Sequence, residues 1–191
     1  MKGREASGSK AELRPHFRQL RRQSLPAAEP GLQRAAASLA EQLQGDQHLG
    51  IYWPLAGEAD LRPLAQQPGL AQRLALPRVA GGQLSYRGWT AGDVLEPDDT
   101  QIPAPRLGPD LEPGALGLLL VPALAVDRRG IRLGYGGGWF DRLRSNPSWA
   151  AVPALTVLPA ACLVDELPAD PWDVPFSGWI DEQGLHWLQG V

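Results

Sequence analysis

The stretch Arg132-Leu133-Gly134-Tyr135-Gly136-Gly137-Gly138-Trp139-Phe140-Asp141-Arg142 places four glycines within five positions. Glycine adopts positive φ readily and lets another group come close to the main chain, at a cost in folding entropy. Successive backbone N–H groups bind anions, and a helix that begins just after them adds the positive end of its dipole. The flanking arginines can bind phosphate oxygens through two hydrogen bonds each. The stretch therefore predicts a phosphate-binding loop, with Asp141 placed as a metal ligand.

Two common phosphate-binding motifs do not fit this loop. A P-loop closes its glycines with a Lys-Ser/Thr pair, which is missing here. The dinucleotide motif G-x-G-x-x-G could begin at Gly134 and Gly136, but its third glycine position is Trp139. A glycine-rich turn that joins a strand to a helix without any ligand is the alternative. The neighbouring arginines and the aspartate favour the phosphate site.

The segments around the loop predict the fold class. Leu118-Leu119-Leu120-Val121-Pro122, just upstream, is continuously aliphatic, as in a parallel strand covered on both faces. Further strands are expected at 48–53, 73–77, 83–86, 150–157, 179–181 and 185–188, and helices at 10–24, 29–44, 58–64 and 138–144. Alternating strands and helices predict a Rossmann-like α/β fold, a three-layer α/β/α sandwich with a mostly parallel central sheet. Residues 10–191 would form one domain behind a flexible N-terminus, residues 1–9. Trp89 is expected in an exposed polar turn, as a stacking surface for a flat ring.

Composition narrows the class of protein. The 18 basic and 21 acidic residues give a net charge of −3, without the basic field that nucleic-acid binding uses. The chain shows no signal-peptide pattern and no apolar run of membrane-spanning length. Cys162 is the only cysteine, which excludes an intrachain disulfide and a cysteine metal cluster. We expect a cytoplasmic, monomeric enzyme with a small-molecule substrate and neither a nucleic-acid nor a membrane partner.

The first predicted helix carries a basic stripe. Lys10, Arg14 and Arg18 recur every four residues, which places them on one face. Most such stripes are solvated faces without a ligand. Pro15 must lie in the first turn or kink the helix, so the helix is expected to begin nearer Arg14.

The segment Asp127-Arg128-Arg129-Gly130-x-Arg132 to Arg142 resembles the signature of the 5-formyltetrahydrofolate cyclo-ligase family, also called methenyltetrahydrofolate synthetases. The usual loop of that family reads R-L-G-x-G-x-G-Y-Y-D and binds ATP. Trp139 and Phe140 keep the aromatic rings of the usual pair but lack both phenol hydroxyls. The resemblance implies ATP-dependent cyclisation of 5-formyltetrahydrofolate to 5,10-methenyltetrahydrofolate, with release of ADP and phosphate. The formyl oxygen would be phosphorylated and N10 would then attack. The folate substrate could carry a polyglutamate tail.

The same resemblance assigns roles to residues along the chain. Lys10 and Arg132 would be catalytic, and Asp141 and Asp173 would hold Mg²⁺. ATP would be bound by Lys10, Arg14, Arg132, Leu133, Gly134, Tyr135, Gly136, Gly137, Gly138, Trp139 and Phe140, and the folate by Trp53, Glu58, Tyr135 and Trp139. Without the resemblance, Glu58 would be interpreted as a charge in the first turn of a helix, Trp53 as core, and Asp173 as a turn residue.

Two other functions fit the same loop. One is a sugar-phosphate isomerase-like enzyme on a similar sheet, which would use neither ATP nor folate. The other is a non-catalytic nucleotide-binding module. Formation of ADP that depends on 5-formyltetrahydrofolate separates the predicted activity from both.

Overall fold

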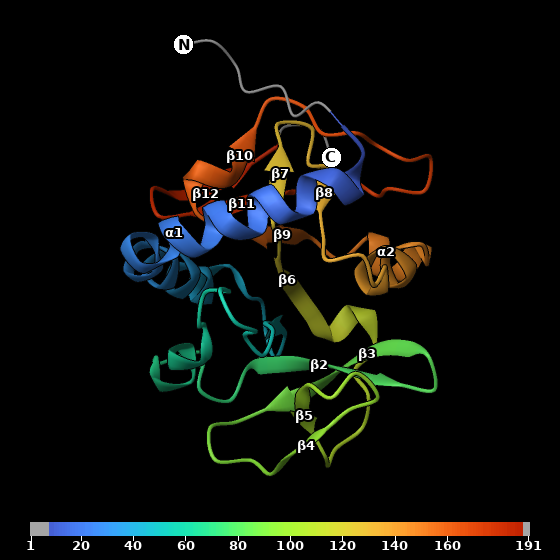
Figure 1. Cartoon of the computed structure of the whole chain (residues 1–191). Coiled ribbons are helices and arrows are strands. Elements are labelled where there is room, and N and C mark those ends of the chain that lie inside the picture. The colour runs from blue at the N-terminus through green and yellow to red at the C-terminus, as the bar shows by residue number, and fades with distance from the viewer. Residues whose placement is uncertain (1–7, 189–191) are drawn as a thin grey trace.

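The computed structural model describes residues 8–188 (Figure 1). Its largest sheet has seven strands in the order β12–β11–β9–β6–β1–β2–β3. The strands are β1 (His48–Gly50), β2 (Leu74–Ala80), β3 (Gln83–Trp89), β6 (Leu116–Pro122), β9 (Ala154–Val157), β11 (Gly178–Asp181) and β12 (Gly184–Trp187). All neighbours pair in parallel except the two edge pairs, β2–β3 and β11–β12. The predicted mostly parallel sheet is confirmed.

The strand order marks the place where a ligand is expected. Along the sheet, the five parallel strands follow the order β2–β1–β6–β9–β11, so the direction of winding reverses between β1 and β6. In open α/β sheets, ligands bind outside the carboxyl ends of the strands at such a reversal. The carboxyl ends of β1 and β6 lead into Ile51 and Ala123.

Helices cover the two faces of the sheet and form the predicted outer layers. Along β6, Leu118 and Leu120 pack in the core cluster that contains Leu32 of α1 (Lys10–Ala37). The alternate residues, Leu119 and Val121, pack on the other face with the elements around α2 (Trp139–Arg144) and α3 (Pro147–Ala150). This alternation follows from the two-residue period of a strand. Figure 1 shows α1 crossing the molecule near β7, β8 and β11, with α2 set apart from it.

The two helices expected at 10–24 and 29–44 are one helix, α1, which begins at Lys10 rather than near Arg14. Ser9 caps it and forms a capping box with Glu12. The helix continues through Pro15, Pro26 and Pro30, all of which are exposed. A proline removes one hydrogen bond and leaves the carbonyl four residues earlier free. Here those carbonyls lie on the exposed side of the helix, where water can hydrogen-bond to them.

Two smaller sheets complete the described structure. β7 (Ala125–Asp127), β8 (Arg132–Leu133) and β10 (Leu163–Val164) form one of them, which packs on the first turns of α1 through Leu13 and Phe17. β4 (Leu95–Pro97) and β5 (Pro103–Pro105) form a hairpin within the long connection between β3 and β6. Short 3₁₀ turns lie at Ser38–Gln42, Arg62–Gln66, Pro113–Ala115 and Ala160–Cys162.

The prediction for Trp89 is wrong. Trp89 ends β3, pairs with Leu74 in register and is only 7% exposed within the core. The predicted flexible terminus, residues 1–9, lies mostly outside the described residues. Within residues 8–188, no helix combines the length and apolar character that crossing a membrane requires.

Candidate active site

A pocket of about 240 Å³ opens where the winding of the sheet reverses. One wall follows β1 and a second follows the glycine loop, while β2, β3 and the β4–β5 loop close the remaining side. The residues that line it are Tyr52, Trp53, Leu55, Glu58, Pro77, Val79, Leu84, Asp98, Thr100, Ile102, Pro122, Arg132, Tyr135, Gly137, Gly138, Trp139 and Phe140. Eight of the residues predicted from the sequence therefore share one cavity: Trp53, Glu58, Arg132, Tyr135, Gly137, Gly138, Trp139 and Phe140.

The glycine loop needs its glycines for two different reasons. Gly136 and Gly138 have φ of 101° and 64°, in the left-handed region that side chains other than glycine rarely adopt. Gly137 has no such φ, but a Cβ there would lie 2.9 Å from Cδ1 of the Trp139 ring. Gly138 is also the N-cap of α2, as the sequence predicted. The loop thus brings bare backbone and the Trp139 ring to the same wall of the pocket.

Arg14 holds the loop from outside the pocket. Its Nε donates to the carbonyl oxygen of Gly134 at 3.0 Å, and its guanidinium lies next to Gly136. Leu133 differs from its neighbours in the loop, because its side chain is fully buried in the cluster that includes Leu13. The carbonyl oxygen of Leu133 accepts a hydrogen bond from the backbone N–H of Leu124 at 2.9 Å, so this residue anchors the start of the loop in the core.

Arg132 is the buried cation of the pocket. Its guanidinium donates to the carbonyl oxygen of Pro122 at 3.0 Å and lies over the ring of Phe140. Burial lowers the pKa of Arg132, and the nearby carboxylates of Asp141 and Asp173 oppose that shift. Its Nε is buried and has no hydrogen-bond partner among the described residues. A buried donor without a partner is costly, and an anionic oxygen in the pocket would satisfy it.

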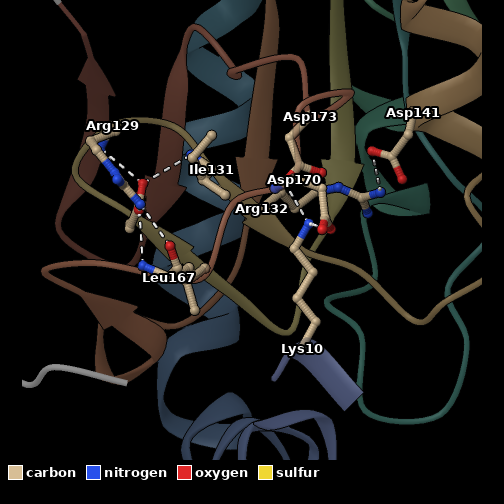
Figure 2. A network of polar contacts seen from close by, with 9 residues as sticks. Lys10, Arg129, Ile131, Arg132, Asp141, Leu167, Asp170 and Asp173 are labelled. Atoms are coloured by element: carbon tan, nitrogen blue, oxygen red, sulfur yellow. Dashed lines mark hydrogen bonds and ion pairs between the residues drawn. The ribbon is translucent and has the colours of Figure 1, made fainter. Parts of the chain in front are cut away.

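Lys10 lies in a second polar group beside Arg132 (Figure 2). Its Nζ is 2.8 Å from Oδ2 of Asp170 and 2.5 Å from Oδ2 of Asp173. Burial lowers the pKa of Lys10, but the hydrogen bonds to the two carboxylates outweigh burial and leave the pKa above its usual value. Asp173 also accepts a hydrogen bond from the backbone N–H of Asp170, so the turn that carries both carboxylates is fixed.

The two predicted metal ligands lie on either side of Arg132. Asp141 Oδ1 is 3.7 Å from Nη2 of Arg132, and Asp173 adds to the electrostatic field at the same guanidinium. No group of three or more potential metal ligands occurs among residues 8–188. Mg²⁺ in nucleotide sites binds through one or two carboxylates together with phosphate oxygens. Asp141 and Asp173 fit this mode of binding, and they do not fit a metal site made of protein ligands alone.

Asp127 ties the segment that carries Asp170 and Asp173 to the hairpin before the glycine loop. Figure 2 labels its three partners, Arg129, Ile131 and Leu167. Asp127 is fully buried and accepts hydrogen bonds from the backbone N–H groups of Arg129, Ile131 and Leu167 at 2.9, 2.9 and 3.0 Å. The Arg129 guanidinium pairs with the same carboxylate and donates to the carbonyl oxygen of Leu167. Several donors to one buried carboxylate make a rigid junction. The sequence placed Asp127 in the signature without giving it a role.

A buried polar group lies beneath the opposite wall of the pocket. Tyr135 accepts a hydrogen bond from Nη1 of Arg21, and Glu58 lies 3.9 Å from the same nitrogen. Burial raises the pKa of the Tyr135 hydroxyl well above its usual value, and the Glu58 charge raises it further. Burial also raises the pKa of Tyr52, whose Oη has no hydrogen-bond partner among the described residues. Both hydroxyls therefore keep their protons at neutral pH.

Other residues of the pocket were not predicted from the sequence. Asp98 accepts hydrogen bonds from Val79, Thr100 and Ile102, which hold the turn after β4. Burial raises the pKa of Asp98, but these hydrogen bonds outweigh burial and lower it overall. Tyr52 lies within the strand predicted at 48–53, so its position next to Trp53 was the available signal. Arg21 was not predicted to be buried, because it belongs to the helix whose basic stripe is typical of a solvated face.

Comparisons with known proteins identify the family of this chain. The model of the 5-formyltetrahydrofolate cyclo-ligase family matches residues 6–180. The chain is 30% identical to the 5-formyltetrahydrofolate cyclo-ligase of Escherichia coli (strain K12) over 133 residues, 66% of this chain and 73% of the relative. It is 29% identical to that of Haemophilus influenzae over 156 residues, 78% and 82% of the two chains. The NMR structure of Aquifex aeolicus 5,10-methenyltetrahydrofolate synthetase matches with a TM-score of 0.73 at 26% identity, covering 95% of this chain and 94% of that one.

Proposed function

The chain belongs to the 5-formyltetrahydrofolate cyclo-ligase family, and we propose that it catalyses the family's reaction. ATP and 5-formyltetrahydrofolate are converted to ADP, phosphate and 5,10-methenyltetrahydrofolate. One observation carries the proposal: the glycine loop and the pocket meet at Arg132, a buried cation whose Nε has no hydrogen-bond partner among the described residues. Residues 10–191 act as one catalytic domain, which the family match over residues 6–180 supports.

The triphosphate of ATP binds at the glycine loop. Phosphoryl transfer depends on positioning and on neutralising charge rather than on covalent chemistry by the protein. Backbone N–H groups between Gly134 and Gly138 contact the phosphates, and Arg14 holds this loop from α1. Lys10 supplies a second cation at the same edge, next to Asp173. Lys10 exchanges its carboxylate partners for phosphate oxygens when the nucleotide enters.

The folate binds in the pocket, with its pterin ring between two walls. Trp53 and Glu58 form one wall, and Tyr135 and Trp139 form the other. Aromatic faces stack on a flat ring, and a carboxylate accepts hydrogen bonds from ring N–H groups. Replacement of the usual aromatic pair by Trp139 and Phe140 keeps this surface. Phe140 instead packs under the Arg132 guanidinium, 5.3 Å from ring centroid to Cζ.

Arg132 acts where the two substrates meet. The γ-phosphoryl group moves from the β-phosphate oxygen of ATP to the formyl oxygen of the folate, and ADP is released. The formyl oxygen is a poor leaving group by itself, and after this transfer it leaves as part of phosphate. N10 attacks the activated carbon and the ring closes, the C–O bond breaks, and the departing phosphate takes up the proton that N10 loses. Negative charge builds up on the transferring group, and a preorganised cation in a pocket shielded from water stabilises it. Arg132 provides that cation, and no nucleophile or general base from the protein is needed.

Asp141 and Asp173 would hold Mg²⁺ together with the phosphates. The ion would neutralise part of the charge on the triphosphate. Asp173 becomes available for this role when Lys10 turns to the nucleotide.

The proposal is tested by mixing the purified protein with ATP, Mg²⁺ and 5-formyltetrahydrofolate. We expect the near-UV absorbance of the methenyl product to rise in step with ADP, with neither change in reactions that lack the folate. Binding of ATP without turnover would support the nucleotide-binding module instead. Turnover of a sugar phosphate without ATP would support the isomerase.

A further inference from the structure

Arg21 is a charged side chain in the interior of the molecule. It lies in the middle of α1 and is 2% exposed, whereas the next residue, Arg22, is exposed. Its Nε and Nη2 are buried without hydrogen-bond partners among residues 8–188. Burial of a charge is unfavourable unless the charge is paired. The contacts of the remaining nitrogen, Nη1, must therefore compensate the cost of burying this charge.

Those contacts connect three parts of the site. Nη1 donates to the carbonyl oxygen of Ala123, directly after β6, at 3.2 Å, and also to the Tyr135 hydroxyl in the glycine loop. The guanidinium carbon lies 5.0 Å from the centroid of the Tyr135 ring. On the third side, Nη1 is 3.9 Å from Oε1 of Glu58. Arg21 itself does not line the pocket, whereas Tyr135 and Glu58 both do.

Glu58 depends on this cation. Its side chain is as buried as that of Arg21, 2% exposed, and Oε2 accepts a hydrogen bond from the backbone N–H of Leu55 at 2.8 Å. Oε1 lies 3.9 Å from Nη1 of Arg21, and the Tyr135 hydroxyl hydrogen-bonds to the same carboxylate. Removing one partner of a buried ion pair leaves an uncompensated charge, which then becomes neutral or moves toward water.

We propose that Arg21 is a positioning residue for the folate: it holds the Glu58 carboxylate in place at the wall of the pocket, and it fixes the Tyr135 hydroxyl beside that carboxylate. The inference rests on the proposed function for the identity of the ligand. Because Arg21 acts through Glu58, its loss weakens folate binding and leaves nucleotide binding nearly unchanged.

The test measures binding rather than turnover. Calorimetry gives the Kd of 5-formyltetrahydrofolate and, separately, of ADP with Mg²⁺, for the wild-type protein and for Arg21→Met, Arg21→Lys and Arg34→Met. Arg34 belongs to the last turn of the same helix and lies outside the site. A hydrogen bond or ion pair of a charged group contributes about 1.5–3 kcal/mol, so Arg21→Met should raise the folate Kd by about ten- to a hundredfold. The ADP Kd should change less than about twofold, Arg21→Lys should recover part of the loss, and Arg34→Met should resemble wild type.

A double variant separates positioning from a general structural effect. In the Glu58→Gln background, Arg21→Met should add little to the loss of folate binding, because the carboxylate through which Arg21 acts is gone. This double variant removes both buried charges, so it is expected to fold even if Arg21→Met alone does not. Additive losses, or equal losses for folate and ADP, would overturn the inference.

Measurements on the wild-type protein distinguish a failure of the proposed function from a failure of the role inferred for Arg21. A wild-type protein that binds the folate but forms no methenyl product would contradict the proposed function, and the Kd comparison would still decide the role of Arg21. A wild-type protein that does not bind the folate would overturn both.

Discussion

Nζ of Lys10 lies 2.5 Å from Oδ2 of Asp173, so the first cation of α1 and a carboxylate 163 positions later form one ion pair at the edge of the glycine loop. The sequence assigned these two residues to different ligands, the phosphates and the metal. Their pairing suggests an exchange. Each neutralises the other in the structure. Under the proposed function, ATP would provide phosphate oxygens for Lys10, and Mg²⁺ would bind Asp173.

The first prediction concerns Lys10. Lys10→Met removes a phosphate contact and leaves Asp170 and Asp173 without their shared cation, so the KM for ATP should rise about tenfold or more. The KM for 5-formyltetrahydrofolate should stay close to the wild-type value, because Lys10 does not line the pocket. Steady-state kinetics with each substrate varied in turn measure both. Equal increases of the two constants would contradict a role at the phosphates.

The second prediction concerns Gly137. A methyl group there would lie 2.9 Å from Cδ1 of Trp139, so Gly137→Ala displaces the indole from the wall of the pocket. We expect ATP-dependent turnover to be lost while the circular dichroism spectrum and cooperative unfolding remain. Gly114→Ala is the matched control, because a Cβ at Gly114 would meet nothing within 4 Å. Near-normal turnover of Gly137→Ala would exclude the loop as the nucleotide site.

The third prediction concerns Glu58. Glu58→Ala removes the acceptor offered to the pterin and should raise the folate KM about tenfold or more, with a smaller change in the ATP KM. The comparison of the two constants is the measurement. If both rise equally, Glu58 serves the fold and has no specific role with the folate.

The fourth prediction concerns pH and stability. The pKa of Asp98 is lowered in the folded protein, so its stabilising contribution is present above the usual aspartate pKa of about 3.9 and is lost as pH falls through the lowered value. Asp98→Asn should reduce the free energy of unfolding by about 1–3 kcal/mol at pH 7. The difference from wild type should shrink in urea titrations as pH falls below about 4. Asp46→Asn, at an exposed position, should cause no comparable change at either pH. A loss that did not depend on pH would contradict the role of the Asp98 charge.

Much of the fold follows from local patterns. The aliphatic run 118–121 predicts a strand buried on both faces, and β6 lies in the middle of the sheet. The helix boundary at Gly138 follows from the glycines before it. The prolines of α1 misled the sequence interpretation, because propensity treats each proline as a break. The long apolar stripe of α1, including Leu25 and Leu32, is held by the sheet, and this tertiary packing outweighs the lost hydrogen bonds.

Candidate site residues were predicted where they belong to a sequence motif. They were missed where residues far apart in the sequence come together only in the folded chain. Six residues of the loop line one pocket with Trp53 and Glu58: Arg132, Tyr135, Gly137, Gly138, Trp139 and Phe140. Leu133, Gly134 and Gly136 do not line it, and the ligand roles of all these residues stay predictions. Arg21 was missed because it stands next to an exposed arginine, Arg22, and because its contact with Tyr135 joins positions more than a hundred residues apart. Trp89 was wrongly predicted to lie in an exposed turn because the residues around it in the sequence are polar. In the structure it ends a strand of the core.

The central claim is that nucleotide and folate meet at Arg132, so that the γ-phosphoryl group passes directly to the formyl oxygen. The most direct measurement uses 5-formyltetrahydrofolate labelled with ¹⁸O in the formyl group, followed by mass spectrometry of the inorganic phosphate that is released. We predict that the label appears in the phosphate, one ¹⁸O for each methenyl product formed. Unlabelled phosphate, with the label released to water, would contradict the claim.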